Sequence, residues 1–485
     1  MKKIRVLSLR IFVFCLMVSF TAAPVTMGAE QYMPDFEKLQ EAKRFFENDP
    51  RPVVKTYGPK QIMPAEDYAH YCHDMATMKA KWAEATGFKS SDLVGKIAPE
   101  IQPGKYTYQD KQKYPGLKEL MIPLMYEKFF KPGEPPFGGC FAEFEVVPTQ
   151  QIYYPLPYTE ATLRNMGKTK QDAQGFFLPD TFISGIPFPK PSGSERMKAM
   201  QIIYNFMYRN PSGCDQNVGM SYNTCWSGKF RQTYMGIGRG PYLRLWGRVY
   251  EEPLGVYDER AKIQHELDHM DLTALAPRDA YGNCTYIVTK VGTDPVEIYL
   301  YSAMLRRIRK MTGTDTQDTG AGSNVTYDDG GGFHQQLSPT LYPYEFKILA
   351  EREYLVPAYS TDGIECIEPS KLEIQNVRLE RRPHYVLELI QKDATYIYGK
   401  RILYVDKETF TITWFENYDQ KGRLFRGGLF YPIFIPEMGL PSWLFGINWN
   451  FQTPQTSITM TWPLVPVRWV TRDYFSFQNM QARGK

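Results

Sequence analysis

The stretch of residues 396–426 places the strongest constraint on the fold, because its apolar residues alternate with polar ones. A period of two is typical of antiparallel strands that bury one face. The alternating apolar positions are Ile402, Tyr404, Phe410, Ile412 and Trp414. Polar segments at residues 406–408 and 419–422 supply turns. This stretch predicts paired antiparallel strands, and it contains no evident cluster of reactive side chains.

Further strand-like runs follow Gln232 and are separated by turn signals. They cover residues 233–235, 242–250, 263–275, 284–291, 297–304, 344–356 and 377–389. None of the intervals between them requires a long helix. A meander of antiparallel strands is therefore the simplest predicted topology.

The first 29 residues have the order of a secretory signal peptide: a basic start, an apolar run at residues 11–20 and small residues after it. The apolar run is about half the roughly 20 residues that a spanning helix needs. The exported remainder contains 53 basic and 53 acidic residues. A formally neutral chain has no overall electrostatic footprint for nucleic acid. We therefore expect an exported protein that does not bind nucleic acid.

Six cysteines lie beyond residue 29, and an even number in an oxidising compartment permits disulfides. Cys214 and Cys225 flank a loop rich in Gly, Asn and Ser, so they are the first predicted pair. No cysteine spacing is typical of a zinc or haem site.

Two segments have helical periodicity. The first, residues 64–85, has Gly87 just past its end; it carries His70 and His73, for which a half-buried pair is favoured over a metal site. The second begins at Ser194 and runs to about Arg209. Its apolar stripe consists of Met197, Met200, Ile203, Tyr204 and Met207. That stripe predicts a core helix, and its flexible methionines also suit the wall of a lipid-binding cavity.

The string His265-Glu266-Leu267-Asp268-His269 satisfies the H-E-x-x-H pattern of zinc peptidases. The chemistry requires a helix, since His residues at i and i+4 then share one face. In a strand the two rings would be about 13 Å apart. No downstream residue stands at a spacing that compels a third ligand. We favour strand histidines at a sheet surface here, with a zinc hydrolase as the alternative.

Other chemical signatures are weak. There is no G-x-S-x-G elbow, no P-loop and no G-x-G-x-x-G motif that opens a βαβ unit. The Gly-rich loop at residues 313–332 carries Asp315, Asp318, Asp328 and Asp329. Carboxylates in such a loop can bind Ca²⁺, but the spacing is not that of an EF-hand. A solvated surface loop is the favoured interpretation, and we predict no catalytic residue, no metal and no cofactor.

A series of short motifs between residues 185 and 426 occurs in a characteristic order. They are Pro187-Phe188-Pro189, Ile298-Tyr299-Leu300-Tyr301, Arg306-Arg307-Ile308-Arg309-Lys310, Tyr344-Glu345-Phe346-Lys347-Ile348, Glu353-Tyr354-Leu355-Val356-Pro357, Tyr398-Gly399-Lys400-Arg401, Tyr404-Val405-Asp406, and Tyr418 with the residues up to Arg426. The series resembles an exported bacterial family, domain of unknown function 1329, often labelled outer membrane lipoprotein-sorting protein. Residues before Phe182 depart from the family pattern.

The resemblance implies a mainly β (α+β) fold similar to the lipoprotein carriers of the Gram-negative envelope. In that fold a large, curved antiparallel sheet forms an incomplete barrel, and helices pack on its concave face. The cavity between them would take acyl chains or other hydrophobic molecules. The candidate wall residues in this chain are Met197, Met200, Tyr204 and Met207.

We expect four regions: a signal peptide at residues 1–29, a mixed helix and loop region at 30–181, the curved sheet with its plugging helix at 182–426, and an apolar aromatic segment at 427–485 that completes the sheet or is exposed to a membrane or a partner. The predicted function is a carrier for a lipid or other hydrophobic molecule in the periplasm or at the periplasmic face of the outer membrane. An outer-membrane or transporter protein is the expected partner. An envelope scaffold without a small ligand is the second alternative, after the zinc hydrolase.

Overall fold

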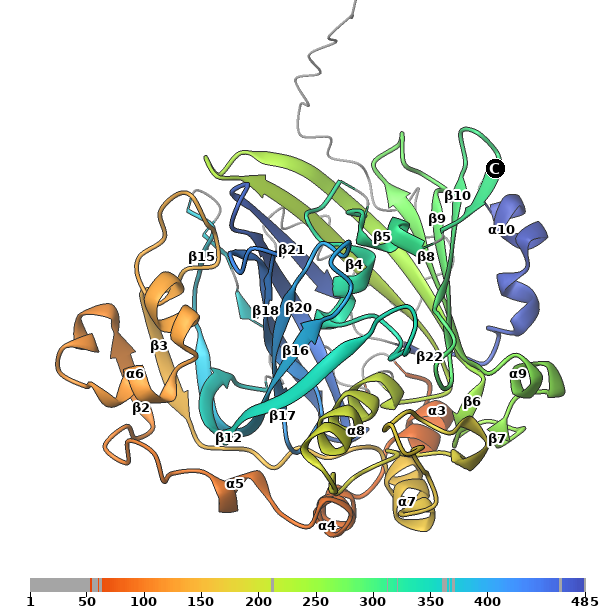
Figure 1. The fold of residues 1–485 in the computed structure, drawn as a ribbon, viewed down its shortest axis with the longest axis horizontal. Coiled ribbons are helices and arrows are strands. Elements are labelled where there is room, and N and C mark those ends of the chain that lie inside the picture. The colour runs from red at the N-terminus through yellow and green to blue at the C-terminus, as the bar shows by residue number, and fades with distance from the viewer. Residues whose placement is uncertain are drawn as a thin grey trace, which may run out of the picture.

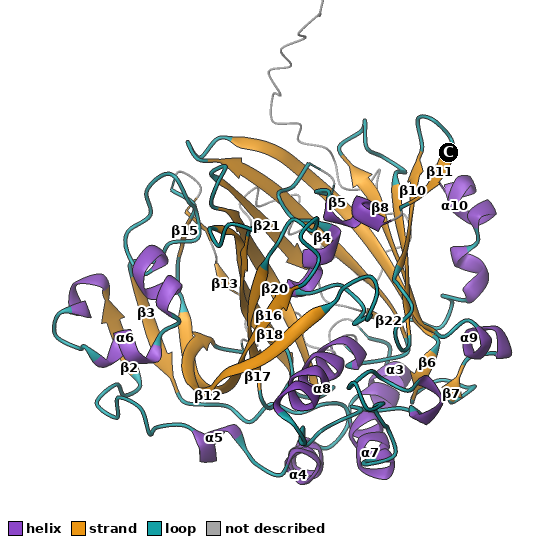
Figure 2. Cartoon of the chain, viewed as in Figure 1, coloured by secondary structure: helices purple, strands orange, loops and turns teal. Residues whose placement is uncertain are grey.

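One large sheet dominates the computed structural model, which describes residues 53–54, 60, 63–210, 213–311, 313–320, 322–359, 364–365, 367–368, 371–461 and 465–483 (Figures 1 and 2). The predicted signal peptide lies outside these residues. In spatial order, the main path of the sheet consists of β11 (Arg307–Lys310), β10 (Glu297–Ser302), β9 (Cys284–Lys290), β8 (Glu266–Ala276), β5 (Gln232–Arg244), β4 (Gln216–Ser227), β21 (Gln455–Thr461), β20 (Leu440–Asn450), β19 (Leu424–Ile435), β18 (Ile412–Tyr418), β17 (Lys400–Asp406), β16 (Arg378–Gln391), β3 (Glu143–Val147) and β2 (Gly104–Thr107). Two strands lie off this path: β12 (Tyr344–Pro357) pairs with β16, and β22 (Val465–Pro466) pairs with β4.

Two antiparallel meanders make up most of this sheet, and β3 with β2 is added at one end by a parallel pairing of β3 with β16. The first runs from β4 through β5, β8, β9 and β10 to β11, and the second runs from β16 to β21. The last strand of the second meander returns to the first strand of the first one, where Ile458 of β21 lies opposite Thr224 of β4. Among the strands described, no pairing joins β11 to β12, so the curved sheet is an incomplete barrel. This confirms the predicted fold class.

The alternating residues of the sheet feed two separate hydrophobic cores. In β17, Leu403 and Val405 belong to the core that contains the helix of residues 195–208. Their neighbours Ile402 and Tyr404 belong to the core on the opposite face. Because successive side chains of a strand point to opposite faces, one strand supplies both layers. The sheet is therefore a wall with packed protein on both sides.

Helices and short sheets complete the fold. The helices are α3 (Ala65–Tyr71), α4 (Met75–Thr86), α5 (Ser90–Leu93), α6 (Gly116–Leu120), α7 (Leu156–Asn165), α8 (Glu195–Tyr208), α9 (Glu259–Ile263) and α10 (Phe477–Arg483), with tighter or wider turns η3 (Tyr108–Lys111), η4 (Met125–Phe129), η5 (Pro179–Thr181), η6 (Gly313–Gln317), η7 (Tyr327–Gly332) and η8 (Arg472–Phe475). The two-stranded sheets are β1 (Val53–Val54) with β13 (Ile364–Glu365), β6 (Trp246–Arg248) with β7 (Gly255–Val256), and β14 (Ile367–Glu368) with β15 (Glu373–Ile374). Helix α8 lies on the concave face against β12, whereas α10 lies outside β10 (Figure 1). No helix in the described part of the chain is long and apolar enough to cross a membrane.

The helix predicted over residues 64–85 is wrong in one respect, because the structure divides it into α3 and α4. The side chain of Asp74 accepts a hydrogen bond of 2.7 Å from the backbone N–H of Thr77 and so starts a new helix. An N-cap residue competes with helix continuation in this way. The predicted end is confirmed, since Gly87 has a φ of 87° and terminates α4.

The predicted disulfide between Cys214 and Cys225 is also wrong. Neither residue forms a disulfide, and both side chains are buried. The segment between them forms β4 and not a loop, and an extended strand of this length spans about 30 Å. Sequence proximity therefore separates the two sulfur atoms instead of joining them. Cys366 lies outside the described residues.

The apolar segment after Arg426 forms β19, β20 and β21, which lie in the middle of the sheet. Trp449 of β20 is fully buried and stacks on Phe129 at a ring-centroid distance of 4.0 Å. Its indole N–H donates to the carbonyl of Gly138. The segment thus completes the sheet. The division of the chain at residues 181 and 426 stays a prediction, and strands from all three regions belong to one sheet.

Candidate functional site

Helix α8 covers one half of the concave face. Its start is set by Ser194, whose side chain accepts a hydrogen bond from the N–H of Met197. On one flank, Arg196 donates to the carbonyl of Tyr344 in β12, and its guanidinium lies over the ring of Phe346. The predicted helix is confirmed within one residue at its end. We call β12, β16, β17, β18 and β19, together with α8, the covered half.

The four residues predicted to line a cavity all lie on α8, but they differ in exposure. Met200 and Tyr204 are completely buried, whereas Met197 and Met207 are partly exposed. The hydroxyl of Tyr204 accepts a hydrogen bond from the N–H of Phe177, and the two rings are 5.1 Å apart. In this structure Met200 and Tyr204 therefore contact protein. The role of all four as a ligand-cavity wall stays a prediction.

Two carboxylates of the Gly-rich loop of residues 313–332 are buried, although a solvated loop was predicted. Asp328 and Asp329 are each 2% exposed, so the solvated-loop interpretation is wrong for them. Tyr396 donates a hydrogen bond of 2.6 Å to Asp328, and Tyr398 donates one of the same length to Asp329. Arg401 forms an ion pair of 2.8 Å with Asp329. Burial raises the pKa of Asp328.

The 396–426 stretch supplies partners for both of these carboxylates. Its tyrosines and Arg401 hold the loop against the sheet from inside the concave face. Polar side chains in a strand are buried here because each one finds a charged or hydrogen-bonding partner. The network fastens the loop, and the carboxylates accept hydrogen bonds from protein groups.

The other half of the concave face, which we call the open half, comprises β4, β5, β8, β9, β10 and β11. Its outer face is packed, because Phe475 stacks on Tyr286 and contacts His269. Its inner face is different, since Leu272 of β8 is 39% exposed and Met270 is partly exposed. The inner residues next to them are small or apolar and partly exposed: Ser221, Asn223, Gly238, Gly240, Ala274, Thr285 and Leu300.

Glycines leave the inner face of β5 without side chains at residues 238 and 240. A Cβ atom on Gly240 would lie 3.3 Å from Cδ2 of Leu272, and one on Gly238 would lie 3.2 Å from Oγ of Ser221. Glycine weakens a strand interior and is often found where a ligand or another backbone approaches closely. The open half therefore presents partly exposed small and apolar groups inside a curved sheet, beside Ile287 and Ile298, which are buried in a cluster with Tyr327 of the Gly-rich loop.

The H-E-x-x-H string lies at the outer face of the open half and is not helical. Helix α9 ends at Ile263, His265 has a φ of 50°, and β8 begins at Glu266. His265 pairs with Asp294, and Nδ1 of His269 lies 3.1 Å from the hydroxyl of Tyr286.

Glu266 is engaged by Arg472 and by His269. Burial opposes its ionisation, but these partners outweigh burial and lower the pKa of Glu266 to about 2. A carboxylate tied to an arginine is not free to act as a general base. Among the described residues, no group of three or more His, Cys, Asp or Glu side chains is arranged to hold a metal ion. The geometry gives the zinc hydrolase no support.

His70, from the other candidate pair, contacts Glu251, while the backbone N–H of His73 donates to the carbonyl of Glu437.

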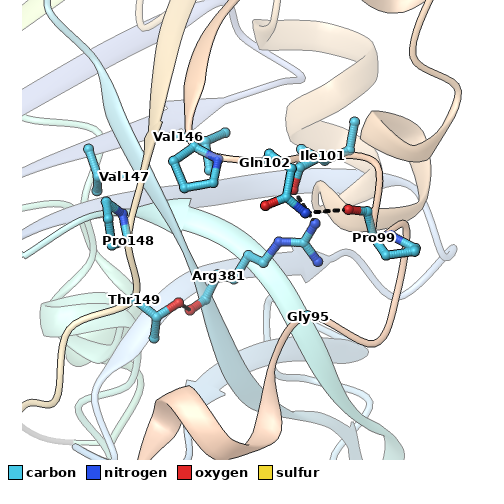
Figure 3. A pocket seen from close by; sticks show the side chains of 10 residues that line it. Gly95, Pro99, Ile101, Gln102, Val146, Val147, Pro148, Thr149 and Arg381 are labelled. Atoms are coloured by element: carbon cyan, nitrogen blue, oxygen red, sulfur yellow. Dashed lines mark hydrogen bonds between the residues drawn. The ribbon is translucent and has the colours of Figure 1, made fainter.

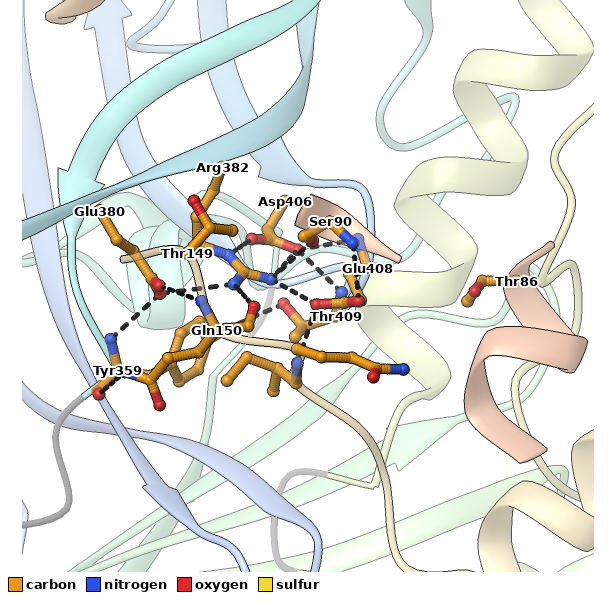
Figure 4. A network of polar contacts seen from close by, with 12 residues as sticks. Thr86, Ser90, Thr149, Gln150, Tyr359, Glu380, Arg382, Asp406, Glu408 and Thr409 are labelled. Atoms are coloured by element: carbon orange, nitrogen blue, oxygen red, sulfur yellow. Dashed lines mark hydrogen bonds and ion pairs between the residues drawn. The ribbon is translucent and has the colours of Figure 1, made fainter. Parts of the chain in front are cut away.

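A buried charge cluster closes the end of the covered half (Figure 4). Arg382 of β16 forms ion pairs with Glu380, Asp406 and Glu408, all of them fully buried. It also donates to Oγ of Ser90 and to the carbonyl of Gln150, so it joins the N-terminal region to the sheet. These charged residues are evident in the sequence, but the sequence does not show that they lie together in the fold.

The carboxylates around Arg382 differ in acidity. Burial raises the pKa of Glu380 to about 7 and also raises the pKa of Glu408. Burial opposes ionisation of Asp406 as well, but Arg382 and hydrogen bonds outweigh it and lower the pKa of Asp406. One arginine balances only one full negative charge, so the remaining carboxyls favour their neutral forms.

A small pocket of about 170 Å³ lies outside the concave face (Figure 3). Its lining includes Pro99, Pro103, Pro148 and Arg381. The guanidinium of Arg381 is occupied, since it donates to the carbonyls of Ile97 and Ala98 at 2.7 Å. Sites for drug-sized ligands usually measure about 300–1,000 Å³. This pocket is too small for an acyl chain, so the open half is the better candidate site.

Comparison with known proteins gives one family match. The profile of a family described as protein of unknown function (DUF1329) matches residues 141–481. No curated protein matches the chain. Solved structures with similarity include an outer membrane lipoprotein-sorting protein domain from Vibrio parahaemolyticus, with 16% identity, a TM-score of 0.41 and coverage of 59% of this chain and 98% of that one. A DUF1329 family protein from Desulfovibrio piger has 12% identity, a TM-score of 0.40 and coverage of 55% and 92%. A LolA superfamily protein from Nitrosomonas europaea has 14% identity, a TM-score of 0.34 and coverage of 57% and 97%.

Proposed function

The chain belongs to the DUF1329 family, as its motifs predicted, and on that premise we propose that it is a carrier for a lipid or other hydrophobic molecule in the bacterial envelope. The motifs identified between residues 185 and 426 lie within the matched range of 141–481. The family description assigns no activity, so the proposal depends on the geometry of this chain.

The observation that supports the proposal is the open half of the concave face. The sheet buries its outer face under η8 and α10, yet leaves Met270 and Leu272 partly exposed on its inner face. Binding sites for small molecules are concave and mostly apolar. A ligand lying on β5 and β8 would cover these side chains and contact the backbone at Gly238 and Gly240.

The aliphatic surface favours acyl or polycyclic ligands over polar ones. Between Met270 and Ala274, the inward positions of β8 carry no charge. The hydroxyl of Thr285, opposite Leu272, is already hydrogen-bonded to Tyr327. Each CH₂ group buried on binding contributes about 0.8 kcal/mol. A ligand with a long hydrocarbon part therefore gains most from this surface.

Displacement of a fluorescent fatty acid tests the proposal, together with native mass spectrometry of the gently purified protein. Leu272→Asp places a charge on the proposed ligand surface and should weaken probe binding by roughly tenfold or more, because a carboxylate desolvated by an acyl chain is costly. Leu349→Asp is the matched control, since Leu349 is a strand residue of β12 that is 51% exposed. Equal probe affinity in the two variants would contradict the assignment to the open half.

The predicted wall on α8 is a separate part of the proposal. Met197 and Met207 are its partly exposed members. Met207→Ser should weaken probe binding several-fold if α8 borders the ligand, whereas Met75→Ser on α4, where the side chain is 45% exposed, should not. Unchanged affinity in Met207→Ser would remove α8 from the site and leave the open half as the wall.

We place this carrier in the periplasm or at the periplasmic face of the outer membrane, in keeping with the predicted signal peptide. An outer-membrane or transporter protein remains the proposed partner. A chain that binds no acyl or sterol-like probe and co-purifies with a stable protein partner would instead be an envelope scaffold. Osmotic-shock fractionation of the native host provides the test of location.

A further inference from the structure

Three turns of the open half lie at the same end of the sheet. They join β4 to β5, β8 to β9 and β10 to β11, and antiparallel pairing directs all three to one side. Figure 1 shows the β8–β9 and β10–β11 turns projecting together beside α10. We call residues 228–231, 277–283 and 303–307 the basic rim.

The β10–β11 turn exposes two large apolar side chains. Ser302 lies opposite Arg307, so residues 303–306 form the loop, and Arg306 closes it with a φ of 52°. Met304 is 81% exposed and Leu305 is 66% exposed. Few apolar side chains are left so bare without a partner.

The turn is held in place by its neighbour. The backbone N–H of Ala303 donates a hydrogen bond of 2.9 Å to Oδ1 of Asn283 in the β8–β9 turn. Tyr281 of that turn is 39% exposed. The apolar side chains therefore project from two connected turns, and their exposure is a feature of a fixed backbone.

Positive charge accompanies the apolar groups. The basic rim contains five cationic residues, Lys229, Arg231, Arg278, Arg306 and Arg307, and one acidic residue, Asp279. The chain beyond residue 29 is formally neutral, with 53 residues of each sign, whereas the connected β8–β9 and β10–β11 turns carry Arg278, Arg306 and Arg307 against Asp279 alone. Lower in β11, Arg309 pairs with Asp315 and Lys310 pairs with Glu297. No ion pair joins Arg306 or Arg307 to another described residue.

Protection of a sheet edge accounts for only part of this arrangement. Basic residues on an edge strand discourage pairing with another sheet, and β11 is such an edge. That role explains Arg309 and Lys310, which lie within the strand. It does not explain Met304 and Leu305, because exposed apolar residues at an edge promote association.

We propose that the basic rim docks on a membrane surface rich in anionic lipid. The side chains of Met304 and Leu305 enter the boundary between headgroups and acyl chains, while Arg306 and Arg307 contact phosphates. Apolar side chains beside arginines and lysines bind anionic interfaces by these two contributions together. Docking also brings the inner face of the open half, through Leu300 of β10, close to the lipid. The proposal holds whether or not the chain carries a hydrophobic ligand.

Vesicle co-sedimentation tests the docking, with the protein purified as the cell processes it. The wild type should sediment with vesicles of phosphatidylcholine and phosphatidylglycerol, and much less with phosphatidylcholine alone. Raising NaCl from about 0.1 M to about 1 M shortens the Debye length from roughly 10 Å to roughly 3 Å and should release it. Arg306→Gln/Arg307→Gln and Met304→Ser/Leu305→Ser should each reduce the partition coefficient by about tenfold or more.

Leu254→Ser/Ile263→Ser is the matched control, because Leu254 is 54% exposed and Ile263 is 71% exposed at the opposite end of the sheet. This variant should sediment like the wild type. Equal loss in the control and the rim variants, equal binding to neutral vesicles, or no vesicle binding by the wild type would overturn the proposal. The last result, with capture of a protein on the rim, would assign the surface to a protein partner. Retained vesicle binding in a variant that has lost the fatty-acid probe would separate docking from the carrier function.

Discussion

The covered half and the open half of the concave face belong to one sheet and follow the same alternation, yet they present opposite surfaces. In the covered half, Leu387 and Leu403 face inward and are completely buried in the core that includes α8. In the open half, Leu272 faces inward and is 39% exposed. Because the alternation is the same in both halves, the difference in exposure arises from the elements that pack on each inner face. A period of two indicates that a strand has two different faces. Which face stays exposed depends on the elements that pack against the sheet.

The two halves also differ in their polar chemistry. The covered half contains buried charges in ion pairs, around Arg382 and around Asp329. The inner face of β8 in the open half carries neutral side chains from Met270 to Ala274. Buried charge fixes one arrangement of the covered half, since moving it would leave charges unpaired. A neutral, partly exposed face can replace one apolar contact with another without leaving a charge unpaired.

The largest effect that would sharpen this comparison is expected at Arg382. Arg382→Leu leaves Glu380, Asp406 and Glu408 without their cation, and we expect the free energy of unfolding to fall by about 3–5 kcal/mol. Urea unfolding followed by tryptophan fluorescence measures the change. Arg278→Leu, at an exposed turn of the open half, serves as the control and should change stability by about 0.5 kcal/mol or less. A small loss at Arg382 would mean that the cluster does not hold the covered half together.

A direct comparison of two methionines should give the next largest effect. Met200→Ala removes a fully buried side chain from the covered half and should cost about 2–5 kcal/mol. Met270→Ala removes a partly exposed side chain from the open half and should cost roughly 1 kcal/mol. Thermal unfolding of both variants in one buffer provides the measurement. Equal losses would show that the two halves are packed alike and would break the comparison.

A pH dependence is expected from the buried carboxyls of the covered half. The pKa of Glu380 is raised from its ordinary value of 4.5 to about 7, so the stabilisation from its protonated form is complete below pH 4.5 and is lost as the pH rises through 7. Glu408 acts in the same direction. Asp406, with a lowered pKa, contributes stability that is lost only as the pH falls below its ordinary value of 3.8. The contribution of Glu380 to the free energy of unfolding should therefore decrease between pH 5 and pH 7.5, by about 1–3 kcal/mol. Burial lowers the pKa values of His269, His334 and His384, and these groups act in the opposite direction.

Glu380→Gln should flatten this slope, because an amide does not titrate. Glu84→Gln, at an exposed position of α4, should leave the slope unchanged. Urea unfolding at both pH values distinguishes the variants. A Glu380→Gln variant with the same slope as the wild type would contradict the assignment of the titrating group.

Much of the fold could be predicted from residues that are close in the sequence. The alternation from Ile402 to Trp414 correctly predicted β17 and β18, and Ser194 correctly placed the start of α8. The prediction of a strand in the H-E-x-x-H segment is confirmed from Glu266 onward by β8. It is wrong for His265, which lies between α9 and β8, and His269 is buried and not at the sheet surface. Strand β4 was missed because its Gly, Asn and Ser content is typical of loops, and the predicted disulfide failed for that reason.

The sequence by itself determined the family, the meander of strands and the helix on the concave face, because each follows from local periodicity or from an ordered series of motifs. Only the tertiary structure decided that Asp328 and Asp329 are buried, that Arg382 gathers three carboxylates and that β21 returns to β4. These features join residues that are far apart in the chain, and local periodicity carries no information about such partners. The open half was decided in the same way, since an alternating strand does not specify whether another element covers it.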